Sequence, residues 1–194
     1  MQFTFTRLSR LNRRQTRLTT FCITAGVGLA ISLALSFPIT EAKPNIGKLP
    51  KDSVANHQLQ TLDGRQFSLA GLRGKVVVLD FFAVWCGHSR DHIPTMTKFR
   101  DAEREGVLQI IGLAVKDKES TQERVRKFIQ EMKIEYPVGM ISDPDFSDYV
   151  NSKDLSVPQT LVYARDGRLV AYFSGHDDKI GADIAATINR ELVK

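Results

Sequence analysis

Hydrophobic residues concentrate in a seven-residue run, residues 76–82, in which only Asp80 is polar. β-branched and aromatic side chains dominate the run, which is typical of a strand buried on both faces. The sequence then reads Trp-Cys-Gly-His-Ser at residues 85–89, and beyond this point apolar residues recur with helical spacing. We therefore predict a buried strand that leads into a helix spanning residues 87–105. Cys86 would lie at the first turn of that helix.

The remaining pattern alternates strands and helices. Two strand pairs flank Asp63-Gly64 and Asp166-Gly167, which are strong signals for hairpin turns. The first helix and the strand after it suit a parallel crossover, and the last two strands suit an antiparallel pair. These features predict an α/β fold of three layers, with a central mixed sheet covered by helices on both faces. Further strands are expected at residues 58–62, 66–69, 107–115, 136–141, 160–163 and 169–173, and further helices at 120–133, 146–150 and 180–192.

Residues 1–42 differ from the rest of the chain. The first 17 residues contain five arginines and no acid, and residues 18–40 carry no charge. This pattern is typical of a signal peptide or of an N-terminal membrane anchor, and the sequence leaves both open. Either one predicts export to the periplasmic side of the inner membrane, whereas an organelle presequence fits less well. Residues 43–52 are interpreted as a linker, and residues 53–194 as one domain.

The formal net charge of +5 resides in the leader. Without the five arginines of the leader, the chain has 22 basic and 22 acidic residues. The expected domain is therefore formally neutral, and its charge gives no argument for a nucleic-acid partner.

Chemistry in the expected domain centres on Cys86. The chain has two cysteines, and the other, Cys22, lies in the apolar part of the leader. No disulfide can therefore form within the domain, and a lone thiol in an exported protein is a candidate reactive group. The N-terminus of a helix favours the thiolate over the thiol, which supports a nucleophilic Cys86. The alternative is a small buried hydrophobic residue, a common role for free cysteine.

The strand ending Asp-Phe-Phe-Ala, followed by Trp-Cys-Gly-His-Ser, resembles the active site of the thioredoxin superfamily, which carries Trp-Cys-x-x-Cys at this junction. The Gly-His pair resembles that of protein disulfide isomerases. The leader, the Leu-Asp-Gly-Arg hairpin at residues 62–65 and the Ser-Val-Pro-Gln-Thr segment at residues 156–160 resemble the exported TlpA/ResA-like branch. The resemblance covers about residues 53–193. Ser89 stands where the family has its second cysteine.

The resemblance implies roles for several residues. Asp80 matches a buried acid that assists proton transfer in the family. Without the second thiol, Asp80 would either tune Cys86 or be a remnant satisfied by local hydrogen bonds. Val157 and Pro158 match a cis-proline loop that faces the cysteine and binds substrate, the alternative being a trans proline that opens a strand. Trp85 and Gly87 would flank the thiol on the substrate side.

Two residues of the first helical turn have alternative interpretations. His88 would stabilise the thiolate if protonated, and otherwise would be a solvated surface residue. Ser89 would leave Cys86 without a resolving partner, or would itself hydrogen-bond the thiolate. Cys86, His88 and His92 together also form a weak candidate metal set, since His88 and His92 are four residues apart on the expected helix.

The leading functional hypothesis is an exported monothiol exchange protein that uses no organic cofactor and acts on thiols and disulfides of proteins or small molecules. Contact with the membrane would run through residues 18–40. One alternative is a one-cysteine peroxidase-like redoxin, although Ala83 replaces the threonine usual three residues before the cysteine. Others are a glutathione-linked glutaredoxin-like module with an iron–sulfur cluster and a substrate- or copper-binding module without turnover.

Overall fold

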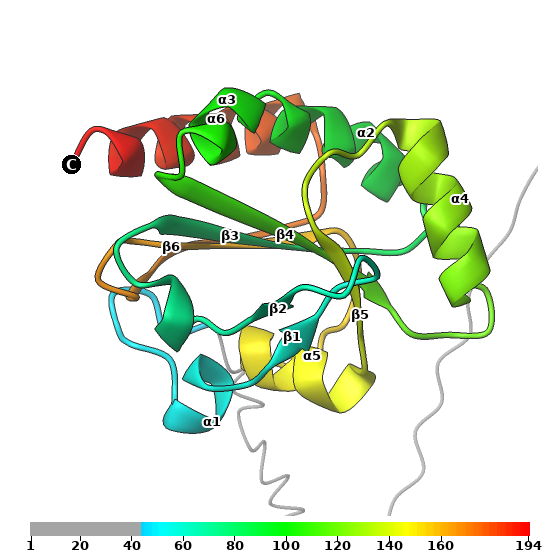
Figure 1. Cartoon of the computed structure of the whole chain (residues 1–194), viewed down its shortest axis with the longest axis horizontal. Helices are drawn as coiled ribbons and strands as arrows, with labels where there is room; N and C mark the ends of the chain where they lie inside the picture. The colour runs from blue at the N-terminus through cyan, green and yellow to red at the C-terminus, as the bar shows by residue number, and fades with distance from the viewer. Residues whose placement is uncertain (1–43) are drawn as a thin grey trace, which may run out of the picture. The chain divides into compact units, whose positions relative to one another are not determined.

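The computed structural model describes residues 44–194, which form a five-stranded sheet and a separate two-stranded hairpin (Figure 1). The five strands lie in the order β5-β4-β3-β6-β7. β3 pairs in parallel with β4 and antiparallel with β6, so the sheet is mixed. β4 and β5 are parallel, and β6 and β7 are antiparallel. The strands are β3 (Val76–Phe82), β4 (Leu108–Val115), β5 (Val138–Ile141), β6 (Gln159–Tyr163) and β7 (Leu169–Ser174), and the hairpin consists of β1 (Leu59–Gln60) and β2 (Gln66–Phe67).

Helices cover both faces of the sheet, as predicted. In Figure 1, α2, α3, α4 and α6 lie on one side of the strands, and α1 and α5 on the other. The apolar clusters of the core agree with this arrangement, because one contains residues of α2, α4 and α6 and the other residues of α1 and α5. The helices are α1 (Asp52–Ala55), α2 (Gly87–Thr97), α3 (Arg100–Arg104), α4 (Gln122–Met132), α5 (Asp143–Val150) and α6 (Asp178–Leu192), with the short 3-10 helix η1 (Ala70–Leu72).

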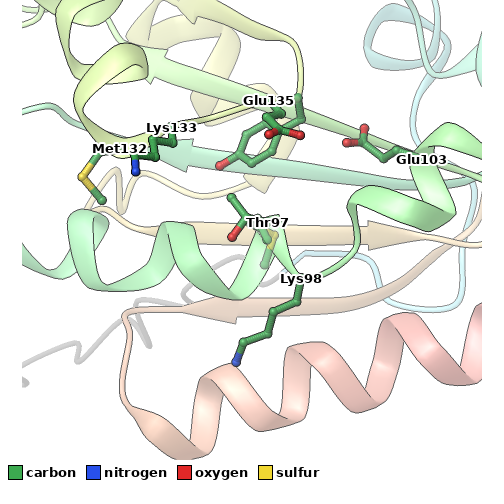
Figure 2. A pocket seen from close by; sticks show the side chains of 8 residues that line it. Thr97, Lys98, Glu103, Met132, Lys133 and Glu135 are labelled. Atoms are coloured by element: carbon green, nitrogen blue, oxygen red, sulfur yellow. The ribbon is translucent and has the colours of Figure 1, made fainter.

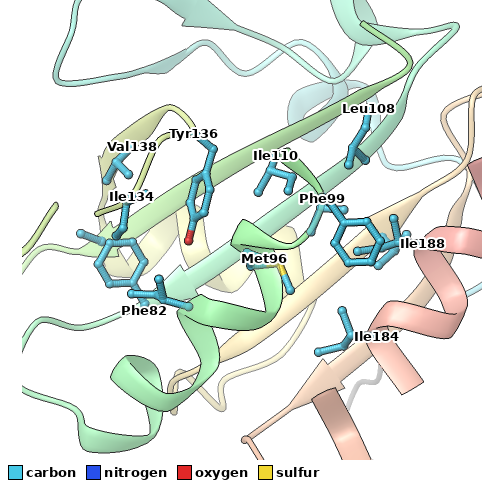
Figure 3. Close-up of a cluster of buried hydrophobic side chains, with 14 of the residues drawn as sticks. Phe82, Met96, Phe99, Leu108, Ile110, Ile134, Tyr136, Val138, Ile184 and Ile188 are labelled. Atoms are coloured by element: carbon cyan, nitrogen blue, oxygen red, sulfur yellow. The ribbon is translucent and has the colours of Figure 1, made fainter. Parts of the chain in front are cut away.

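β3 is the central strand, and all seven of its residues are buried. Strand alternation sends its side chains to opposite layers. Val76, Val78 and Phe82 join the core on the α2 side, part of which Figure 3 shows, and Val77, Leu79 and Phe81 join the core on the α5 side. Asp80 lies between Val78 and Phe82 in this alternation, so its carboxylate is on the α2 side.

The expected helix at 87–105 is divided in two. α2 ends at Thr97, and α3 begins at Arg100. The Thr97 hydroxyl donates a hydrogen bond to the Pro94 carbonyl, 3.0 Å away, and Phe99 turns into the core with 8% of its surface exposed. Burial of this aromatic side chain explains the break, since it stabilises the packed state more than one further helical turn would.

The three-layer α/β class and its mixed sheet are confirmed. The leader interpretation of residues 1–42 lies outside the described residues. Among residues 44–194, every helix falls short of the length and apolar character that a membrane span requires.

Candidate functional site

Cys86 lies where β3 passes into α2. It is the N-cap of α2, with extended backbone (φ −85°, ψ 118°), and the Arg90 N–H donates to its carbonyl at 3.2 Å. The Cys86 N–H itself donates back to the Ala83 carbonyl at 3.2 Å, which closes the turn between strand and helix. The side chain is half-exposed and makes no disulfide. The strand therefore delivers a reachable thiol to the helix terminus, where the dipole favours negative charge.

The loop that faces Cys86 contains a cis peptide bond between Val157 and Pro158. The Cys86 Sγ lies 3.5 Å from the Val157 carbonyl oxygen, in hydrogen-bond contact. On its other side the loop is held by Gly175, whose N–H donates to the Pro158 carbonyl at 2.8 Å. The prediction that a cis proline opposes the cysteine is confirmed in geometry. The carbonyl before the proline is therefore in direct contact with the thiol.

Trp85 is exposed next to Cys86, with 57% of its surface accessible. Its indole N–H donates to Asp117 Oδ2 at 2.8 Å. Burial acts to raise the pKa of Asp117, but hydrogen bonds from Trp85 and from the Glu119 and Ser120 backbone N–H groups lower it overall. Asp117 therefore remains ionised and holds a large aromatic ring beside the thiol.

Removing this anchor is expected to release the ring. In Asp117→Ala, the collisional quenching of Trp85 fluorescence by acrylamide should rise by about twofold, because loss of a charge-assisted hydrogen bond frees the indole. Trp85 is the only tryptophan in the chain, so the signal reports this ring alone. Asp166→Ala is the matched control, since that carboxylate pairs with Arg168 on the turn between β6 and β7. Equal quenching in the wild type and Asp117→Ala would contradict the anchoring role.

The other residues of the first turn of α2 differ in exposure. Gly87 and His88 are exposed, and Ser89 is fully buried. The Ser89 hydroxyl accepts a hydrogen bond from the Ala83 N–H at 3.3 Å. This contact ties the helix to the end of β3 and leaves the hydroxyl proton of Ser89 free to donate elsewhere, so a bond from Ser89 to the thiolate stays a prediction. An alanine side chain at position 87 would meet no atom within 4 Å, so steric fit does not require glycine there.

Asp80 is completely buried beneath α2. His92 Nε2, also buried, lies 3.1 Å from Asp80 Oδ1 and 3.0 Å from the Thr160 hydroxyl. The first distance suits an ion pair, although no aligned hydrogen bond reaches either oxygen of Asp80 from the described residues. Thr160 lies directly opposite Asp80 on β6. The buried acid thus has a histidine partner, which is a more specific arrangement than the sequence predicted.

Tyr136 is a second buried titratable residue whose electrostatics this acid affects. Its hydroxyl is buried without a hydrogen-bond partner among the described residues, and Figure 3 shows it pointing toward α2 near Met96. Burial is the main cause that raises the pKa of Tyr136, and the charge of Asp80 adds to the effect. Gly112 of β4 pairs with Asp80 of β3 and makes room for the Tyr136 ring. A Cβ atom at position 112 would come 3.0 Å from Tyr136 Cε2.

The candidate metal set separates in the structure. His92 is directed into the core against Asp80, whereas His88 is exposed. Across residues 44–194, no three histidine, cysteine or carboxylate side chains are arranged to hold a metal ion.

A cavity of about 480 Å³ opens elsewhere, between the end of α2 and the end of α4 (Figure 2). Met96, Lys98, Met132, Lys133 and Tyr136 are among its lining residues. Cys86 and the cis-proline loop do not line it, so this cavity is separate from the thiol site.

Asp117 and His176 were not predicted as site residues, and neither were Thr160 and Tyr136, which surround Asp80. His176 Nδ1 lies 3.2 Å from His92 Nδ1, and their rings meet edge to face with centroids 5.2 Å apart. Asp117 and His176 each lie in a loop far along the chain from the partner side chain, and no periodic pattern relates the positions. Only the fold brings them to the site.

Comparison with known proteins gives the same assignment as the fold. Residues 50–172 match the model of the AhpC/TSA family. The thioredoxin-like protein YneN of Bacillus subtilis is 27% identical over 128 residues, which is 66% of this chain and 73% of the relative. The thiol-disulfide oxidoreductase ResA of Bacillus cereus is 25% identical over 87% of this chain and 91% of its own length.

The same fold occurs in a solved structure, the thiol:disulfide interchange protein of the thioredoxin family from Chlorobium tepidum. It aligns with a TM-score of 0.60 and 24% identity over 78% of this chain and 97% of its own. The expected resemblance to thioredoxin-like oxidoreductases is thus confirmed at the level of fold and family. With a thioredoxin-like sheet and a family match over more than half of its length, this chain belongs to the AhpC/TSA family.

Proposed function

We propose that the protein is an exported thiol:disulfide oxidoreductase that works through Cys86 alone. One observation carries the proposal: a half-exposed thiol at the N-terminus of α2 lies 3.5 Å from the Val157 carbonyl, directly before a cis proline. The thiol is reachable from solvent, as a nucleophile must be, and it lies at the N-terminus of α2. The names of relatives such as ResA support the same reaction class.

The proposed reaction begins with attack of the Cys86 thiolate on one sulfur of a substrate disulfide. A bond forms between Cys86 Sγ and that sulfur, and the substrate disulfide breaks. Its electron pair leaves with the second sulfur as a thiolate, which takes a proton from water. The backbone of Val157 would pair with an extended substrate segment, and Trp85 would cover its apolar side chains. His88 and Gly87 would complete the exposed edge around the thiolate.

The mixed disulfide must be resolved by another molecule. Ser89 offers a hydroxyl, which cannot form a disulfide, and the second cysteine of the chain, Cys22, lies in the leader. A second thiol of the substrate would attack the substrate sulfur of the mixed disulfide and release the Cys86 thiolate, which completes an isomerisation. For a reduction, one small thiol such as glutathione would attack Cys86 Sγ and release the substrate thiolate, and a second one would then release the Cys86 thiolate as oxidised glutathione forms. The proposed partners are therefore protein or small-molecule thiols and disulfides, and no organic cofactor takes part.

Export is proposed from the leader, either as a cleaved signal or as an anchor through residues 18–40. An exported location on the periplasmic side agrees with the reaction, because disulfides form and persist in oxidising compartments.

The test is a comparison of two activities of the full chain. We expect the protein to rearrange the disulfides of a scrambled substrate protein in a glutathione buffer. We expect it to consume hydrogen peroxide no faster than free cysteine does. Loss of rearrangement together with rapid peroxide consumption would replace this proposal with the peroxidase-like alternative. If the protein shows neither activity, the alternative of a binding module without turnover would be favoured.

A further inference from the structure

His92 and His176 face each other with ring nitrogens of the same kind, Nδ1 to Nδ1, 3.2 Å apart. Such a contact is stable only when the two Nδ1 atoms share a single proton between them. With one proton, one nitrogen donates and the other accepts. With two protons, two N–H groups repel each other, and with none, two lone pairs do. The contact between these rings therefore depends on the protonation of the pair.

The surroundings decide which ring carries the charge. His92 Nε2 lies 3.1 Å from Asp80 Oδ1 and 3.0 Å from the Thr160 hydroxyl, and a proton on this nitrogen avoids repulsion between its lone pair and the oxygen of Asp80. Burial acts to lower the pKa of His92, but the nearby charge of Asp80 raises the pKa overall. Tyr136, the other titratable group beside Asp80, keeps its proton because its pKa is raised.

His176 behaves in the opposite way. Burial, and after it the nearby charge of His92, lower the pKa of His176. The carboxylates of Asp91, Asp177 and Asp178 face it from α2, the α6 N-cap and α6, and they offset only part of this effect. His92 is therefore the more basic of the two rings: when the pair carries one positive charge, His92 holds it and donates from Nδ1, and His176 is neutral and accepts.

A continuous set of contacts joins this pair to the thiol. Gly175, the residue before His176, donates its N–H to the Pro158 carbonyl at 2.8 Å. The carbonyl of Val157 contacts the Cys86 thiol. Cys86 is the N-cap of α2, and His92 lies in α2. The imidazole pair thus fastens the segment around Gly175, which supports the cis-proline loop, to the helix that carries the nucleophile.

We propose that His92 and His176 are positioning residues that hold the substrate-binding cis-proline loop against α2 near neutral pH and release it in acid. This inference rests on the proposed thiol exchange and adds to it a dependence on pH that Cys86 ionisation alone does not supply. When His176 gains a proton, the two N–H groups meet and the rings must separate. The Gly175 segment then moves away from α2, and the loop loses its support.

On the alkaline side the contact survives. If His92 loses its Nδ1 proton, neutral His176 can change tautomer and donate from its own Nδ1. Only acidification breaks the pair, and it does so as pH falls through the lowered pKa of His176.

The experiment compares two reactions of Cys86 in the full chain. Exchange with a disulfide-linked peptide needs both the thiolate and the loop, whereas alkylation by iodoacetamide needs only the thiolate. The ratio of the two rates therefore cancels Cys86 ionisation. In the wild type we expect this ratio to fall by about tenfold between about pH 7.5 and about pH 5, as repulsion between two cations separates the rings.

The variant His176→Gln cannot gain a proton, and its ratio should stay within about twofold over the same range. His176→Phe, which keeps an aromatic ring against His92, provides a second variant with the same expectation. His57→Gln is the matched control, because His57 contacts Tyr149 and Asp145 on the opposite face of the sheet, and it should keep the wild-type fall. A constant ratio in the wild type, or an unchanged fall in both His176 variants, would overturn the inference.

A readout independent of exchange separates this inference from the proposed function. The NMR amide signals of Val157 and Gly175 should shift with the titration of His176 in the wild type and stay constant in His176→Gln. If the protein exchanges no disulfide but these signals titrate, the proposed function fails, whereas the link between the protonation of His176 and the position of the cis-proline loop stands. If these signals do not titrate, the link between His176 and the loop is refuted, whether or not the protein exchanges disulfides.

Discussion

Replacing Cys86 by alanine is expected to reduce thiol–disulfide exchange to the rate measured without protein. The thiolate at the N-cap of α2 is the only nucleophile that the proposed site contains, so no partial reaction should remain. The structure should tolerate the change, because the side chain makes one hydrogen bond, to Val157, and its loss costs about 1 kcal/mol of unfolding free energy. The measurement is the initial rate of mixed-disulfide formation with a peptide disulfide, beside a urea unfolding curve.

Cys22→Ser is the matched control for this loss. It removes the other cysteine of the chain and should retain the full wild-type rate. A Cys86→Ala protein that is folded and still exchanges disulfides would remove Cys86 from the mechanism.

The second large effect is expected from Ser89→Cys. Positions 86 and 89 are three residues apart at the start of α2, so their side chains lie near each other on the helix. After Cys86 has formed a mixed disulfide, the thiolate introduced at position 89 would attack Cys86 Sγ. A disulfide forms between the sulfurs at positions 86 and 89, and the substrate sulfur leaves as a thiolate. The lifetime of the mixed disulfide should fall by at least ~100-fold, because the resolving thiol is intramolecular.

Ser147→Cys tests whether any added thiol has this effect. Ser147 lies in α5, on the other face of the sheet from α2, so a thiol there should leave the mixed disulfide long-lived. The lifetime can be followed by acid quench and intact mass. An unchanged lifetime in Ser89→Cys would show that the absence of a resolving thiol at this position is not what limits the reaction.

Much of this site could be predicted from local sequence. The apolar run of β3 and the helical spacing after it place Cys86 at their junction, because strand and helix periodicities are local properties. Alternation within β3 also placed Asp80 in the core beneath α2. The opposition of Val157-Pro158 to the thiol came from resemblance to a family and not from any pattern, since cis geometry has no periodic signal.

The partners of Asp80 illustrate what a single sequence does not contain. His92 was interpreted by helical spacing as a companion of His88, but the burial of one face of α2 separates them. His176 lies 84 positions from His92, and only the packing of the segment after β7 against α2 joins them. Asp117 likewise reaches Trp85 across 32 positions. Side-chain contacts of this range depend on tertiary packing.

The break between α2 and α3 has a similar origin. Helical spacing continues through Phe99, so the sequence predicted one long helix. The structure ends α2 early because Phe99 must enter the core formed with α6, where Ile188 is also buried. Core packing overrides local propensity here, as it commonly does.

The most direct measurement of the central claim is the mass of the intact protein after reaction with a peptide disulfide and acid quench. We predict one added peptide half, located on Cys86 by fragmentation, which persists until glutathione is supplied and then disappears. A protein that carries no adduct, or whose adduct is lost without any added thiol, would contradict exchange through a single cysteine.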